Sequence, residues 1–200
     1  MEDVLMPDTM VLSPTAVRWT REDCSTFDRT GILPYRYELV EGVINKLGQN
    51  YTHANMVRLL IAWLFSTFGE EFIFTQTSID VRPEDNSTNK PEPDGIVLAL
   101  PASELTANPR PYEIRLLIEA SDTTVAYDLT TKAALYARAE IVEYWVVALT
   151  ERKLCVHRQP RNGVYQDVTT YSESDQVAPL AAPDRAVLVA RLLPPLQAEK

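Results

Sequence analysis

The chain has 200 residues, of which 46% are hydrophobic and 24% are charged. These shares are close to globular averages and exclude a collagen-like chain, a coiled coil and an intrinsically disordered chain. The length suits one domain, and two cysteines support neither a disulfide framework nor a four-ligand zinc site.

The net charge is −9, from 28 acidic and 19 basic residues. This sign opposes non-specific binding to nucleic acid, because phosphate contacts require lysine and arginine. It leaves room for a metal-dependent nuclease, because bound cations reverse the local field. The sequence has no apolar run of the roughly 20 residues that span a membrane. The first residues lack the basic and apolar parts of a secretory signal, so we expect a cytoplasmic protein.

The N-terminal part predicts a poorly ordered lead followed by a helix. Residues 1–17 contain two prolines and no periodic pattern, whereas residues 18–195 carry the signals of a single domain. Thr20 can cap a short helix that ends before Gly31, since its hydroxyl can accept a backbone N–H.

A hairpin and a long helix follow. Two β-rich runs within residues 35–47 flank Glu41-Gly42, which predicts a β-hairpin with its turn at this dipeptide. Apolar residues at helical spacing predict a helix over residues 53–68, and Gly69 provides a stop signal.

The remaining elements alternate between strands and one helix. Apolar runs predict strands over residues 72–81, 95–100, 114–119 and 142–149, the last paired with 153–157, and a short strand pair from 163–165 and 168–171. A helix is expected over residues 128–139. Alternation along a strand places one of Tyr144 and Trp145 in the core. The predicted class is α+β: a mixed, sandwich-like sheet flanked by helices, with an N-terminal helix and hairpin.

Three charged residues lie at the borders of apolar segments. Asp94 precedes one apolar strand, Glu119 ends another, and Lys132 follows Asp128 by four residues on the next helix. Two carboxylates brought together at strand ends repel each other unless they bind a cation such as Mg²⁺. The simpler interpretation is that each acid faces water or bonds a loop amide, and that Lys132 forms a solvated ion pair with Asp128.

A longer string of residues resembles a known family. It consists of Tyr37-Glu38-Leu39-Val40-Glu41-Gly42, His53, Pro93-Asp94, Glu119-Ala120-Ser121-Asp122-Thr123, Tyr127-Asp128, Lys132, Leu135-Tyr136-Ala137-Arg138-Ala139 and Glu143-Tyr144-Trp145-Val146-Val147. In order and spacing, these residues resemble the Uma-two type of putative restriction endonucleases, a branch of the PD-(D/E)XK nuclease superfamily. The resemblance covers about residues 18–195 and is most specific from Glu119 to Val147.

The resemblance implies a restriction-endonuclease-like core with an acidic site at its strand ends. Asp94 and Glu119 would bind the metal, Mg²⁺ or Mn²⁺, with the Ala120 carbonyl as a further ligand. In the superfamily a lysine usually lies two residues after the second acid, where this chain has Ser121. The resemblance assigns that lysine to the following helix, at Lys132.

The implied function is metal-dependent hydrolysis of nucleic-acid phosphodiester bonds, with DNA as the expected substrate and a homodimer as the expected assembly. Glu38 would complete the acidic cluster, or else be a solvated hairpin carboxylate. His53 would contact the substrate, or else cap its helix. The alternative function is a non-catalytic binding or assembly module that keeps the fold, which the negative charge and Ser121 favour.

Overall fold

The structure is a computed structural model that describes residues 17–48 and 50–195. The expected lead over residues 1–17 therefore lies, apart from Val17, outside the described residues. The helices are α1 (Arg21–Thr30), α2 (Tyr51–Phe68), α3 (Pro83–Asn86), α4 (Val125–Tyr127) and α5 (Ala133–Arg138), with a π-helical turn over Asp128–Lys132. Short 3-10 turns span Glu70–Phe72, Ala102–Glu104, Pro111–Glu113 and Val189–Leu192. The strands are β1 (Tyr37–Val40), β2 (Val43–Lys46), β3 (Ile73–Phe74), β4 (Gly95–Leu98), β5 (Ile114–Ser121), β6 (Glu143–Ala148), β7 (Lys153–Arg161), β8 (Val164–Ser172), β9 (Gln176–Val177) and β10 (Val187–Leu188).

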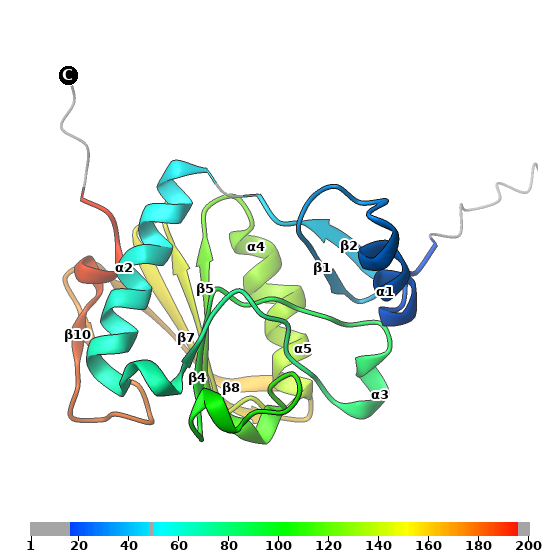
Figure 1. Cartoon of the computed structure of the whole chain (residues 1–200). Coiled ribbons are helices and arrows are strands. Elements are labelled where there is room, and N and C mark those ends of the chain that lie inside the picture. Colours follow the sequence, from blue (N-terminus) through cyan, green and yellow to red (C-terminus); the bar gives the residue numbers. More distant parts are fainter. Residues whose placement is uncertain (1–16, 49, 196–200) are drawn as a thin grey trace, which may run out of the picture.

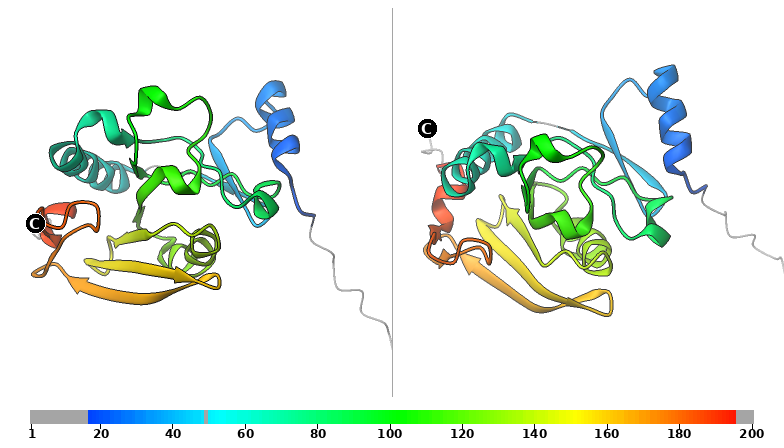
Figure 2. Two further views of the ribbon diagram at one scale, coloured as in Figure 1. Left: turned by 90° about the horizontal axis from the view of Figure 1, so that it is seen from below. Right: turned by 60° about the horizontal axis from the view of Figure 1, so that its bottom comes forward.

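The centre of the molecule is a mixed six-stranded sheet in the order β3-β4-β5-β6-β7-β8. Only β5 and β6 pair in parallel, and the helical segment α4–α5 makes the crossover between them. Figure 1 shows α2 on one side of the sheet and α4–α5 on the other, and Figure 2 shows the same layers from two further directions. The hairpin β1–β2 lies beside α4–α5, and helix α1 packs against β1.

The alternating side chains of β5 build two cores, one on each face of the sheet. Leu116 and Ile118 belong to the core under α2, whereas Leu117 belongs to the core under α5. Because both faces are covered, Tyr144 and Trp145 are both fully buried. The prediction that only one of them enters the core was therefore wrong.

The N-terminal elements follow their local signals. Thr20 caps α1 in a capping box with Asp23, and Gly31 ends the helix at a φ of 66°. The hairpin turns at Glu41 and Gly42, whose φ angles of 52° and 74° are those of a tight hairpin turn. Both predictions are confirmed.

Two strand predictions need correction. The strand expected over residues 72–81 ends at Phe74, because Gln76 adopts a left-handed φ of 53° and the chain leaves the sheet. Ile79 and Val81 are still buried in the core under α5. Their apolar side chains therefore indicate burial, although the residues do not pair in a strand. The pair expected within residues 163–171 is instead the single strand β8, which pairs with β7.

A fully buried carboxylate anchors the C-terminal segment. Glu143 accepts hydrogen bonds from Trp145 Nε1 (3.0 Å), Arg158 Nε (2.8 Å) and the backbone N–H of Leu180 (2.8 Å). Glu143→Gln is expected to lower the free energy of unfolding by about 3 kcal/mol, because Arg158 would lose its buried counter-charge. Urea denaturation measures this loss, and equal stabilities of this variant and the exposed Glu151→Gln would contradict it.

No helix within residues 17–48 and 50–195 combines the length and the apolar character that a membrane crossing requires.

Candidate functional site

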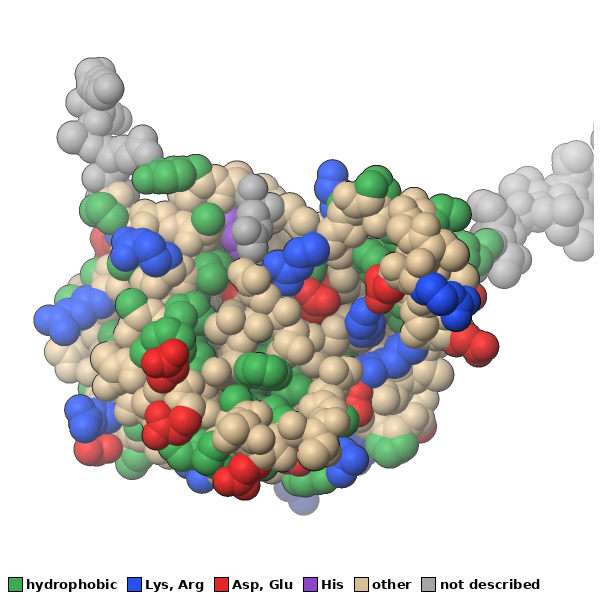
Figure 3. Space-filling view, viewed as in Figure 1, with side chains coloured by type: hydrophobic (Ala, Val, Ile, Leu, Met, Phe, Trp, Pro, Cys, Tyr) green, Lys and Arg blue, Asp and Glu red, His purple; other side chains and the backbone are tan. Residues whose placement is uncertain are grey.

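A pocket of about 410 Å³ opens at the carboxyl end of β5. Its walls are the hairpin β1–β2, the N-terminal turn of α2 and the loop that leads from β5 into α4. Figure 3 shows the hollowed face, with a histidine and acidic and basic side chains around it. The structure brings all five sequence-predicted residues to the lining of this pocket: Glu38, His53, Asp94, Glu119 and Lys132.

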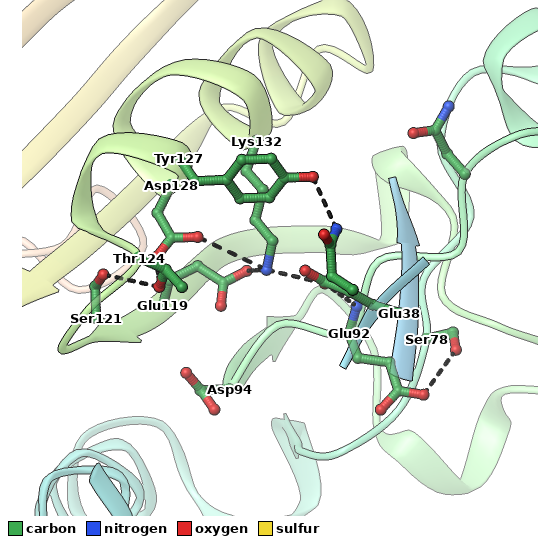
Figure 4. A network of polar contacts seen from close by, with 12 residues as sticks. Glu38, Ser78, Glu92, Asp94, Glu119, Ser121, Thr124, Tyr127, Asp128 and Lys132 are labelled. Carbon is green, nitrogen blue, oxygen red and sulfur yellow. Dashed lines mark hydrogen bonds and ion pairs between the residues drawn. The ribbon is translucent and has the colours of Figure 1, made fainter. Parts of the chain in front are cut away.

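Lys132 lies at the centre of a buried ionic cluster (Figure 4). Its Nζ lies 2.9 Å from Glu38 Oε2, 3.0 Å from Glu119 Oε1 and 3.8 Å from Asp128 Oδ1. The four side chains are at most 6% exposed. The interpretation that Lys132 forms a solvated ion pair is therefore wrong. Glu38 is a buried member of the cluster and not a solvated hairpin carboxylate.

Neighbouring groups orient the carboxylates of this cluster. The Tyr136 hydroxyl donates to Glu119 Oε1 at 3.1 Å, the backbone N–H of Glu92 donates to Glu38 Oε2 at 3.3 Å, and Thr124 Oγ1 donates to Asp128 Oδ2 at 2.7 Å. A carboxylate that accepts several donors has a restricted rotamer. The cluster is therefore held in place before any ligand arrives.

Burial and neighbouring negative charges both raise the pKa values of Glu119 and Glu38. Burial raises the pKa of Glu119 well above its usual value, and Asp128, Asp94 and Glu38 raise it further, against the lowering effect of Lys132. Burial also raises the pKa of Glu38. For Lys132, burial lowers the pKa, but the three carboxylates outweigh it and the net shift is upward. Lys132 thus stays protonated among carboxylates that exceed it in number.

These shifts predict a pH dependence of stability. The pKa values of Glu119 and Glu38 are higher in the folded state than in the unfolded state, where they are near 4.5. Their stabilising contribution is thus complete below pH 4.5 and is lost as pH rises through the folded-state values. Relative to the wild type, Glu119→Gln is expected to gain stability as pH rises from 4.5. Urea denaturation at a series of pH values measures the difference in free energy of unfolding between the variant and the wild type. The expectation would be contradicted if this difference changed with pH as little as it does for the exposed Glu104→Gln.

Asp94 lies at the more open part of the pocket. Its Oδ2 accepts the backbone N–H of Ala120 at 2.8 Å, which ties the start of β4 to the end of β5. Its Oδ1 lies 3.4 Å from His53 Nε2. The hydrogen bond to Asp94 raises the pKa of His53, against the lowering effect of burial. Helix α2 begins at Tyr51 and is capped by the Asn50 side chain, so the expectation that His53 caps it was wrong.

The π-helical turn is the feature that sequence reasoning missed. It spans Asp128–Lys132, inside the helix predicted over residues 128–139. A π turn is a helical turn with one extra residue, and no residue pattern in the sequence marks it. Such turns are nevertheless frequent at functional sites. Tyr136 was not among the predicted site residues, yet it lies four residues after Lys132 and its hydroxyl contacts Glu119, as Lys132 does.

The sequence profile of the Uma2 family, described as putative restriction endonucleases, matches residues 32–190. The chain belongs to this family. No curated protein matches the chain at a significant level. Among solved structures, one similar chain is a putative nuclease belonging to DUF820 from Anabaena variabilis, with 15% sequence identity and a TM-score of 0.61. The match covers 83% of this chain and 96% of that one. At this identity the likeness shows the fold alone, and it confirms the restriction-endonuclease-like α+β fold expected for an Uma2 protein.

The pocket of this Uma2 protein suits a hard divalent ion. Six carboxylates and three lysine or arginine side chains line it, so negative charge is in excess. Mg²⁺ typically binds proteins through one or two carboxylates and completes its shell with water and phosphate oxygens. Within residues 17–48 and 50–195, no three His, Cys, Asp or Glu side chains form a ready metal cluster. Asp94 and Glu119 both line the pocket and supply two carboxylates of this kind.

Proposed function

We propose that this Uma2 protein is a metal-dependent endonuclease that hydrolyses phosphodiester bonds of DNA. The observation that carries the proposal is the convergence of Asp94, Glu119 and Lys132, which lie far apart in the sequence, on one acidic pocket. Family membership and the nuclease fold support the same reaction class.

Asp94 and Glu119 would hold the divalent ion, Mg²⁺ or Mn²⁺, with the Ala120 carbonyl as a further ligand. When bound, such an ion neutralises phosphate charge and makes a water more acidic. Glu119 belongs to this set because burial and three other carboxylates leave it in need of positive charge beyond that of Lys132.

Lys132 is assigned the role of the catalytic cation. An ammonium has three N–H donors, and Glu38 and Glu119 take two of them within 3.0 Å. Asp128 Oδ1, at 3.8 Å, is too distant for a hydrogen bond. The third donor is thus available to the attacking water or to the phosphate oxygen on which negative charge develops. Ser121 occupies the usual position of the superfamily's lysine. Its hydroxyl shares a hydrogen bond with Thr124 Oγ1 and is uncharged, so it cannot replace the lysine.

Glu38 and His53 complete the proposed machinery. Glu38 holds the ammonium in its charged form and directs it toward Glu119. The His53 side chain is 16% exposed at the more open part of the pocket, where an imidazole can contact a substrate oxygen. We also propose that the protein acts in the cytoplasm as a homodimer, since cutting both strands of a duplex is simplest with two sites related by a two-fold axis.

A plasmid-nicking assay tests the function. Supercoiled DNA incubated with the protein and Mg²⁺ or Mn²⁺ is expected to become nicked or linear, and EDTA is expected to stop the reaction. Cleavage that persists in EDTA would contradict metal dependence. Absence of cleavage of DNA and RNA with either metal would favour the alternative, a binding or assembly module that keeps the nuclease fold.

A further inference from the structure

Arg36 is an accessible cation of the catalytic pocket that has no role in the proposed machinery. It lines the pocket together with Lys132, but its side chain is 47% exposed, whereas that of Lys132 is 5% exposed. Six carboxylates line the same pocket, and the whole chain has a net charge of −9. A polyanionic substrate is therefore repelled at the pocket unless an accessible cation offsets this charge.

The register of the hairpin β1–β2 directs Arg36 toward the pocket. Arg36 precedes β1, and its carbonyl accepts the backbone N–H of Leu47 at 2.9 Å, which extends the pairing of the two strands. Side chains alternate along a strand, so Arg36 shares its face with Glu38, a member of the buried ionic cluster. The same strand face thus carries a buried carboxylate and, two residues earlier, an accessible guanidinium.

An ion pair holds the Arg36 guanidinium from one side. Its Nη2 donates to Glu92 Oε2 at 2.8 Å, and Ser78 Oγ donates to Glu92 Oε1 at 3.4 Å. Within residues 17–48 and 50–195 the guanidinium makes no other hydrogen bond. A guanidinium has five N–H donors in a rigid fork, and this fork matches the oxygens of a phosphate. Arg36 is thus oriented by a carboxylate and retains donors for an anionic ligand.

Lys46, the other accessible cation of the lining, directs its charge elsewhere. It pairs with Tyr37 across the hairpin, and the Tyr37 hydroxyl donates to the Cys24 carbonyl on α1. Directly opposed residues share a face of the hairpin, so Lys46 extends on the side of α1. Its Nζ lies 5.1 Å from the centre of the Tyr35 ring. Arg36 is therefore the better placed of the two cations to meet an anion that enters the pocket.

An anion on Arg36 is not the phosphate that is cut. The Glu92 carboxylate binds Arg36, and the Glu92 backbone N–H donates to Glu38. Glu38 in turn binds Lys132, so two residues separate the two cations. In Figure 4 the Glu92 carboxylate points away from Lys132 and toward Ser78. The scissile phosphate has to reach the buried cluster, whereas a phosphate on Arg36 lies outside it.

We propose that Arg36 is a substrate-binding residue, which holds a DNA phosphate next to the one that is cut. This assignment rests on the proposed function and deepens it, because it defines the substrate as a chain with a second phosphate beside the scissile bond. The second phosphate does not react, so its contact with Arg36 is equally strong before and during the reaction. Such a contact tightens substrate binding without accelerating the chemical step.

Binding is tested by the fluorescence anisotropy of a labelled DNA duplex in the Asp94→Asn background, which is expected to fold without cleaving. Arg36→Gln is expected to weaken binding about tenfold, because one charge-assisted phosphate contact is lost. The slope of log Kd against the logarithm of the salt concentration should fall by about 0.9, the value for one phosphate contact. Arg161→Gln is the matched control, since Arg161 is exposed at the end of β7 and does not line the pocket. Equal changes in the two variants, or no change in either, would overturn the site.

Cleavage kinetics test which phosphate Arg36 holds. In the protein with Asp94 intact and Mg²⁺ present, Arg36→Gln is expected to raise KM about tenfold and to lower kcat by less than about twofold. A fall in kcat as large as the fall in kcat/KM would place Arg36 on the reacting phosphate and overturn the proposal. A protein that cleaves no nucleic acid would refute the proposed function, while the anisotropy measurement would still decide whether Arg36 binds a DNA phosphate.

Discussion

Lys132→Met is expected to abolish DNA cleavage and to lower the free energy of unfolding by about 3–5 kcal/mol. Methionine fills a similar volume but leaves Glu38, Glu119 and Asp128 buried without their shared cation. Breaking a buried ion pair from one side is costly because the remaining charge has neither water nor partner. Urea denaturation measures the stability, and plasmid nicking measures the activity, with an expected loss of at least about 100-fold.

A double variant separates the two effects. Lys132→Met combined with Glu38→Gln removes one of the uncompensated carboxylates, so part of the lost stability should return. Cleavage should stay absent, because no ammonium remains beside Glu119. If the double variant were to cleave at the wild-type rate, Lys132 would have a structural role and no catalytic one.

Asp94→Asn should eliminate both cleavage and the stabilisation of the protein by divalent metal. A ligand at ten times its Kd stabilises the folded state by about 1.4 kcal/mol, which corresponds to a rise in Tm of roughly 3–6 °C for a chain of this size. The wild type is expected to show this rise with Mg²⁺ or Mn²⁺. Asparagine keeps an oxygen that can accept the Ala120 N–H, so the variant should fold, but it removes the charge that holds the ion.

Asp167→Asn serves as the matched control for Asp94→Asn. Asp167 lies on β8, outside the lining of the catalytic pocket, so its replacement should leave the metal-dependent rise in Tm intact. Thermal melting with and without metal measures all three proteins. A rise of equal size in Asp94→Asn would show that the ion binds elsewhere, and the assignment of Asp94 as a ligand would fall.

Local signals were sufficient for the elements whose stability is local. The capping box at Thr20 and the Glu41-Gly42 turn need only neighbouring residues, and both occur where the sequence indicates them. The segment after Phe74 shows the opposite case. Ile79 and Val81 pack under α5 without pairing in the sheet, and the sequence signals this loss of pairing only by a break in the alternation at Gln76.

The candidate site, too, was predictable from the sequence only in part. The order and type of Asp94, Glu119 and Lys132, read with their neighbours, were enough to indicate the Uma2 family and its restriction-endonuclease-like fold. The depth of the Lys132 cluster, the pairing of Asp94 with His53 and the π turn were not readable from the chain.

The sequence by itself determined the class of fold, the family and the side chains that could carry chemistry, because periodicity, caps and motif spacing are properties of neighbouring residues. Only the tertiary structure decided which carboxylates share Lys132 and which faces are closed to water. Those outcomes depend on the packing of β1, β5 and the π turn against one another, over separations of many residues. The energy of a buried charge is set by what surrounds it in space, and a linear chain does not specify those surroundings until it has folded.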